Sequence, residues 1–115
     1  MSAETHDHKI CPVENLFSVV AGRWTPYLIF SLATQGPQRF GALQRHMPRI
    51  STKVLTDRLR MLERSGLVHR EQAATIPPQV TYSLTPRGEE LHKAMKMLGD
   101  IAQRWAAEGW TPDAA

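Results

Sequence analysis

The chain has 115 residues, of which 42% are hydrophobic, and it contains a single cysteine. This size and composition suit one compact domain without a structural metal, and one cysteine excludes an intramolecular disulfide. No apolar run approaches the roughly 20 residues of a membrane span, and the N-terminus lacks the apolar centre of a secretory signal. We therefore expect a cytoplasmic protein without a membrane partner, with a flexible tail at 1–10, a domain at 11–110 and a short tail at 111–115.

Positive charge is concentrated in one part of the chain. The net charge is +3 overall, whereas the segment from Gly36 to Gln72 holds eight basic and three acidic residues. A local excess of arginine is typical of a surface that contacts a polyanion, since each neutralised phosphate releases a counterion. A solvated basic face is the alternative, and the order of the secondary structure elements decides between the two.

Two helices are predicted before most of the basic residues. The first begins at Pro12, which suits the first helical position, and ends before Gly22. The second covers residues 25–34 and is stopped by Gly36-Pro37. The residues of the second helix that we expect to be mostly buried are Tyr27, Leu28, Ile29, Phe30 and Leu32.

A short helix over 40–47 and a longer helix over 52–65 are predicted next. Pro48 ends the short helix, Ser51 is placed to accept a backbone hydrogen bond at the start of the longer one, and Gly66 stops it. Two helices joined by a short turn, the second longer and more basic, form a helix-turn-helix pattern.

After Gly66 the apolar pattern changes from a helical to a strand period. Strands are predicted over 67–71 and 80–84, and residues 72–79 between them contain Pro77-Pro78, so they predict a projecting loop, the wing. Thr85 and Pro86 start a last helix. The predicted fold is mainly α with a small β-hairpin, a winged helix-turn-helix.

The last helix carries an apolar seam whose members recur at spacings of four and three residues. The seam packs either against the protein's own first two helices or against a second copy. The short chain has little core left to cover it, which favours a homodimer formed by the N- and C-terminal helices. The expected dimer interface consists of Leu16, Leu91, Met95, Leu98, Ala102 and Trp105.

A helical wheel divides the helix after Ser51 into two sides. The leucines face the core, and the charged residues lie opposite. Base contacts usually come from the N-terminal part of a recognition helix, which favours Thr52, Lys53 and Thr56 as readers of base edges. Arg58 lies near the apolar side and is expected to brace the helix or reach a phosphate. The predicted DNA-binding residues, each with an ordinary solvated side chain as its alternative, are Arg39, Ser51, Thr52, Lys53, Thr56, Arg58, Arg60, Arg70, Gln72 and Gln79.

Five motifs in chain order resemble the HxlR family of prokaryotic winged-helix regulators, relatives of the MarR group. They are CP at 11, RW at 23, GPQRF at 36, ISTKVLTDRLRMLERSGLVHR at 50 and PPQVTYSLTPRG at 77. The resemblance covers residues 11–110 and implies a DNA-binding homodimer with recognition by the helix after Ser51 and a wing at 72–79. Many relatives carry an aromatic wing residue and a basic residue after the paired prolines, where this chain has Ala73 and Gln79.

Several family members sense electrophiles or oxidants through a cysteine near the N-terminus, and Cys11 matches that position. A helix N-terminus stabilises a thiolate, whereas the carboxylate of Glu14 opposes it. A structural or incidental thiol is the alternative. His6-Asp7-His8 has no further ligands at suitable spacing, so we expect no metal and no cofactor.

The sequence therefore predicts a sequence-specific transcriptional regulator without enzymatic activity, a repressor that binds an inverted repeat in double-stranded DNA as a homodimer. Its recognition helices would lie roughly 34 Å apart, and a small-molecule or oxidant effector is left open. Two alternatives stay open: a winged helix used for protein contacts, and a small thiol-dependent enzyme using Cys11. For the enzyme, neither a base nor an orienting partner can be placed beside the thiol.

Overall fold

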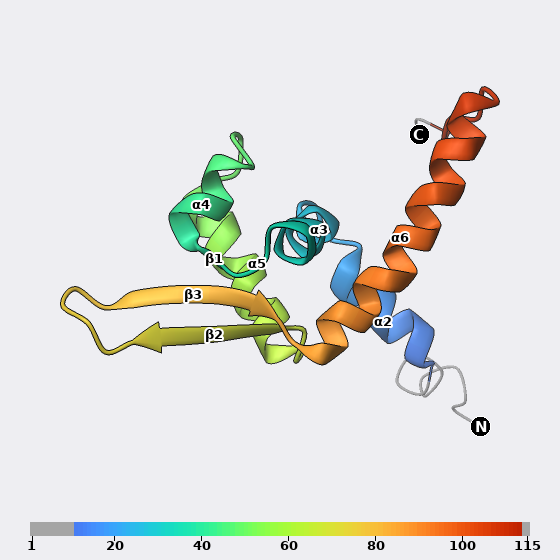
Figure 1. The fold of residues 1–115 in the computed structure, drawn as a ribbon. Coiled ribbons are helices and arrows are strands. Elements are labelled where there is room, and N and C mark those ends of the chain that lie inside the picture. The colour runs from blue at the N-terminus through green and yellow to red at the C-terminus, as the bar shows by residue number, and fades with distance from the viewer. Residues whose placement is uncertain (1–10, 114–115) are drawn as a thin grey trace.

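The computed structural model describes residues 11–113, so the predicted tail at 1–10, with His6-Asp7-His8, lies outside the described residues. The described elements in chain order are α2 (Pro12–Val20), α3 (Thr25–Gln35), β1 (Gln38–Arg39), α4 (Phe40–Arg45), α5 (Thr52–Arg64), β2 (Val68–Ala73), β3 (Gln79–Leu84) and α6 (Pro86–Ala107). The predicted fold, mainly helical with a small β-hairpin, is confirmed. The β2–β3 hairpin projects on one side of the helices, and α6 extends away on the other (Figure 1).

Two hydroxyl side chains cap the helices α5 and α6. Ser51 caps α5, as predicted, because its hydroxyl accepts a hydrogen bond from the backbone amide of Val54 at 3.1 Å. Thr85 caps α6 in the same way by accepting from the amide of Gly88 at 3.1 Å, and it donates to the carbonyl of Gly66 at 2.6 Å. Thr85 therefore joins the end of the α5 segment to the start of α6.

The hairpin is longer than predicted, and its loop is shorter. The strands pair from Val68 opposite Leu84 out to Ala73 opposite Gln79, which leaves residues 74–78 as the loop. The prediction of a loop over 72–79 is wrong, because Gln72, Ala73 and Gln79 belong to the ladder. Backbone hydrogen bonds hold this outer part together, and such bonds need no apolar side chain that a sequence pattern would reveal.

The sheet has a further strand that the sequence did not predict. The two residues of β1 pair antiparallel with β3, so the strand order is β1-β3-β2. Gln38 of β1 is buried, and its Nε2 donates to the carbonyl and hydroxyl oxygens of Ser31 at 3.1 and 3.0 Å. These bonds fix β1 against α3. A strand of two residues has no alternation from which it could be predicted.

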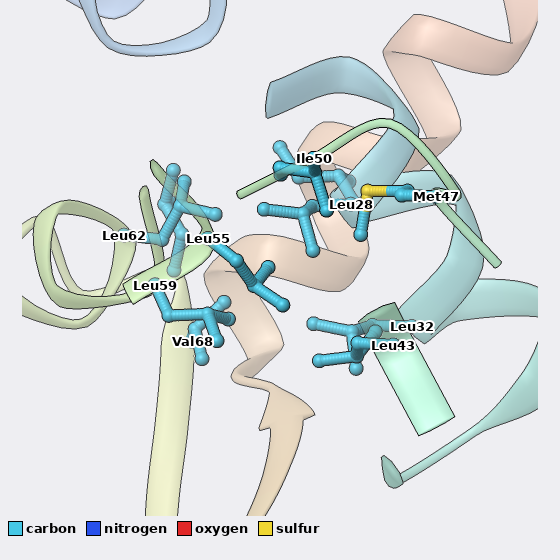
Figure 2. Close-up of a cluster of buried hydrophobic side chains, with 11 residues drawn as sticks. Leu28, Leu32, Leu43, Met47, Ile50, Leu55, Leu59, Leu62 and Val68 are labelled. Carbon is cyan, nitrogen blue, oxygen red and sulfur yellow. The ribbon is translucent and has the colours of Figure 1, made fainter. Parts of the chain in front are cut away.

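The hydrophobic core lies where α3, α4 and α5 meet. Figure 2 shows Leu55 and Leu59 of α5 directed toward Leu28 and Leu32 of α3. All four side chains are at most 2% exposed. The core-facing side predicted for α5 is therefore confirmed, and α5 is held rigidly by its apolar side.

Burial in α3 was predicted correctly for three residues and wrongly for one. Leu28, Ile29 and Leu32 are buried and Phe30 is half-buried, but Tyr27 is 50% exposed. A run of apolar residues exceeds what one helix face can hold, so the residue at the edge of that face stays in solvent.

The apolar seam of α6 divides into two parts. Leu91 and Met95 pack against the core, whereas Ala102 is exposed, Leu98 is 57% exposed and Trp105 is 46% exposed. Packing within the chain is therefore confirmed for the start of the seam, and the remainder is open, so packing against a second copy stays a prediction.

An apolar groove of about 400 Å³ lies between α2 and α6. On the α2 side of the groove, Leu16 is 39% exposed and Phe17 is 53% exposed. The groove-lining residues are Val13, Leu16, Phe17, Val20, Leu91, Ala94, Met95, Met97, Leu98 and Ile101. The helices predicted to form a dimer interface thus share one open apolar surface.

Within residues 11–113, no single helix is long and apolar enough to cross a membrane. The helices α2 and α3 have the length and apolar composition of a membrane span only when they are taken together, and the chain bends by 83° between them.

Candidate nucleic-acid interface

The start of α5 presents the predicted base-reading residues in different states of exposure. Thr52 and Lys53 are exposed, and Thr56 is half-buried. Because the opposite side of α5 is buried in the core, these side chains project from a fixed helix. Their placement suits contact with a large partner surface.

Two of these residues have side-chain partners that the sequence analysis did not select. Gln44 of α4 donates from Nε2 to the hydroxyl oxygen of Thr52 at 3.1 Å. Lys53 forms an ion pair with Asp57 one turn further along, with Nζ and Oδ2 2.9 Å apart. The spacing of four residues could have indicated the second pair. The first joins two helices and could not be found from spacing.

The charge on Asp57 is maintained by its surroundings. The hydrogen bond from Lys53 lowers the pKa of the Asp57 carboxyl, and the positive charges of Lys53, Arg60 and Arg58 add to this effect. Asp57 is therefore ionised at neutral pH and partly neutralises an otherwise basic helix surface.

A hollow of about 320 Å³ lies between α5 and the hairpin. Arg60 of α5 and Arg70 of β2 line it, together with Thr56, Glu63 and Tyr82. The register places Arg70 directly opposite Tyr82 in the ladder. Two predicted DNA-binding arginines from separate elements are thus brought to one concave surface, where an anion would be attracted to both.

The structure also brings Arg39 and Gln79 together. A guanidinium nitrogen of Arg39 donates to the side-chain oxygen of Gln79 at 2.6 Å, across 40 residues of sequence. The pairing of β1 with β3 creates this contact, and both side chains are exposed. Gln72 is exposed on β2, opposite Val80 in the ladder.

Arg58 has the bracing contact that its place on the wheel predicts. It is half-buried, and its Nε donates to the backbone oxygen of Arg23 at 2.9 Å. The next residue, Trp24, has a φ of 76°, a left-handed conformation that is costly for a bulky side chain. The Arg23 guanidinium lies 5.3 Å from the Trp24 ring centre. Arg58 thus ties α5 to this strained link between α2 and α3.

Cys11 stands immediately before α2, as predicted, and is partly exposed. Its side chain makes no cap hydrogen bond to the helix. Among residues 11–113, no group of three or more histidine, cysteine, aspartate or glutamate residues could hold a metal ion.

Comparison with known proteins finds the same type of protein by sequence and by structure. The helix-turn-helix regulator YdeP of Bacillus subtilis, itself uncharacterised, is 35% identical over 86% of this chain and 77% of its own length. A chain from Enterococcus faecalis V583 assigned to the MarR family of transcriptional regulators superimposes with a TM-score of 0.78 at 39% identity, covering 84% of this chain and 87% of the other. The oxidised form of the redox regulator HypR gives a TM-score of 0.74 at 34% identity, covering 90% and 100%.

The family model for HxlR-like helix-turn-helix proteins matches residues 19–109. This range runs from the end of α2 to just beyond α6, so it contains the helix-turn-helix, the hairpin and the seam. The predicted family resemblance is confirmed, and the chain belongs to the HxlR-like helix-turn-helix family.

Proposed function

We propose that this protein is a DNA-binding transcriptional regulator that inserts the start of α5 into the major groove of double-stranded DNA. The observation that carries the proposal is the exposure of Thr52 and Lys53 at the N-terminus of a rigidly packed α5, whose Arg60 shares a hollow with Arg70 of β2. The relatives named as helix-turn-helix transcriptional regulators support it. The proposal includes no enzymatic step and no cofactor.

The polar residues of this surface divide into two roles. Thr52, Lys53 and Thr56 contact base edges, where lysine donates to guanine and threonine bonds or touches a thymine methyl. The phosphate contacts come from the residues around the helix start and from the cationic and amide side chains on the strands and on α5. These residues are Arg39, Ser51, Arg60, Arg70, Gln72 and Gln79, whereas Arg58 serves the interface by bracing α5 through its bond to Arg23.

The active form in this proposal is a homodimer that acts in the cytoplasm. The open groove between α2 and α6 supports it, since a second copy would cover Leu16, Leu98 and Trp105. Two-fold symmetry then matches an inverted repeat whose half-sites lie about one helical turn, roughly 34 Å, apart. Occupation of such a site within a promoter would repress transcription.

Cys11 gives the regulator a response to oxidants in this proposal. Its thiol is partly exposed at the start of α2, and the similarity to HypR, a redox regulator, supports the assignment. An oxidant such as diamide would accept two electrons and two protons as the thiols of two copies join in a disulfide. We expect diamide to change DNA binding by the wild type but not by Cys11→Ser, and an equal response of both proteins would contradict this role.

The test of DNA binding is the salt dependence of affinity for a duplex. We expect the logarithm of the affinity to fall linearly with the logarithm of salt concentration, with a slope of about −0.9 for each phosphate neutralised. The double variant Arg60→Ala, Arg70→Ala should flatten this slope, whereas Arg104→Ala on the exposed side of α6 should leave it unchanged. Binding that is absent or insensitive to salt would refute the proposal and favour a protein-contact module.

A further inference from the structure

The hydrogen bond between Gln44 and Thr52 joins the two helices of the helix-turn-helix on the side of the molecule where α5 begins. Gln44 lies in the last turn of α4 and is half-buried, and Thr52 is the first residue of α5 and is exposed. The bond from Nε2 to Oγ1 is 3.1 Å long. It holds the amide of Gln44 beside the residues that enter the groove first.

This bond leaves hydrogen-bonding capacity on the Gln44 amide. A primary amide has two N–H donors on nitrogen and an oxygen that accepts. One N–H is used by Thr52, so the second N–H and Oε1 are left for another partner while the bond holds the amide in place. The backbone of α4 is itself fixed, because Leu43 is fully buried in the core.

The major-groove edge of adenine is the complement of such an amide. Its N7 accepts a hydrogen bond, and its N6 amino group donates one, so a glutamine side chain can engage both at once. We propose that Gln44 is a specificity-determining residue that reads an adenine in each half-site, with Thr52 acting as the residue that positions it. This inference rests on the proposed DNA-binding function and adds a base contact from α4 to those from α5.

The bond between Gln44 and Thr52 could instead only hold α4 and α5 together, without any base contact by Gln44. Its loss would then lower stability and weaken binding to every duplex by a similar factor. Loss of a base contact would change the preference at one base pair and leave the salt dependence unchanged, because no phosphate contact is removed.

The experiment begins by selecting the preferred duplex of the wild-type protein from a random pool. Each adenine of that duplex is then replaced in turn by 7-deazaadenine, which keeps base pairing but lacks the N7 acceptor. We expect one symmetry-related position at which this change weakens wild-type binding by about fivefold to 100-fold. Gln44→Ala should be insensitive to the change at that position, and Thr52→Val should respond less than the wild type.

Two further measurements keep the outcomes separate. Gln103→Ala, an exposed glutamine on α6, should respond to 7-deazaadenine as the wild type does. Melting temperatures show whether Gln44→Ala is folded, and the conservative Gln44→Asn variant replaces it if it is not. A uniform loss of affinity for all duplexes, or an unchanged response to 7-deazaadenine in the Gln44 variants, would overturn the inference. Absence of any duplex binding by the wild type would instead refute the proposed function.

Discussion

Two arginines of α5 that are only two positions apart have different environments. Arg58 is half-buried and donates to the backbone oxygen of Arg23, whereas Arg60 lines the open hollow beside the hairpin. Two residues along a helix correspond to a rotation of 200°, so one side chain turns toward the core and the other away from it. Position on the helix, and not residue type, therefore separates a bracing arginine from one that is free to bind phosphate.

Lys53 and Arg39 lie on the same proposed interface but are expected to contribute differently. Lys53→Ala should change the preference among bases at one position by about 1–3 kcal/mol, because a base contact is lost. Arg39→Ala should weaken all duplexes similarly and reduce the magnitude of the salt slope by about 1, because one phosphate contact is lost.

Binding isotherms of both variants on a panel of single-base duplexes, at several salt concentrations, check this difference. A Lys53→Ala variant that loses affinity uniformly would contradict its role as a reader. An Arg39→Ala variant with the parental salt slope would contradict a phosphate contact by Arg39. The guanidinium would then serve only its bond to Gln79.

At the scale of elements, the junction between the sheet and α6 leaves no room for a side chain. A β-carbon on Gly88 would collide with the backbone oxygen of Leu67 and would lie 3.0 Å from the Leu84 side chain. Gly88 also donates its amide to the hydroxyl of Thr85. This close approach sets the direction in which α6 leaves the winged helix.

Gly88→Ala is therefore expected to destabilise the fold by about 2–3 kcal/mol, since the backbone at Leu67 cannot move without disturbing the sheet. Gly99→Ala is the matched control, because a β-carbon there meets no atom within 4 Å and alanine is the better helix former by about 1 kcal/mol. Thermal unfolding should show a fall of about 10 °C or more for Gly88→Ala and no fall for Gly99→Ala. Equal melting temperatures in the two variants would contradict this account of the junction.

At the scale of the whole molecule, most of the apolar surface left open lies on one side. The groove between α2 and α6 is lined by apolar residues of both helices, and two of them, Met97 and Leu98, are 68% and 57% exposed. Such a contiguous apolar surface marks an interaction site. The proposed DNA-binding surface of α5 and the hairpin lies apart from α2 and the free end of α6 (Figure 1).

Leu98→Asp should convert the proposed homodimer into a monomer, because a buried unpaired carboxylate would be costly at the interface. The affinity of this variant for an inverted repeat should fall to that for a single half-site. Gln103→Asp places the same charge on the same helix, at a position that is not part of the groove. Light scattering during size-exclusion chromatography checks both variants, and a dimeric Leu98→Asp variant would contradict the proposed interface.

The sequence by itself determined the order of the helices, the cap at Ser51, the core side of α5 and the bracing role of Arg58. These features depend on local signals, such as helical periodicity and capping residues, that act within a few positions of the chain. The extent of α5 was predicted to within one residue for the same reason.

Only the tertiary structure decided the contacts between distant segments. The strand β1, the bond from Arg39 to Gln79 and the bond from Gln44 to Thr52 depend on how elements pack, which no local pattern encodes. The short wing loop has the same origin, since backbone pairing extends β2 and β3 through polar residues. The tertiary structure also divided the α6 seam, because α3 and β3 cover only its first part and leave Leu98 and Trp105 in solvent.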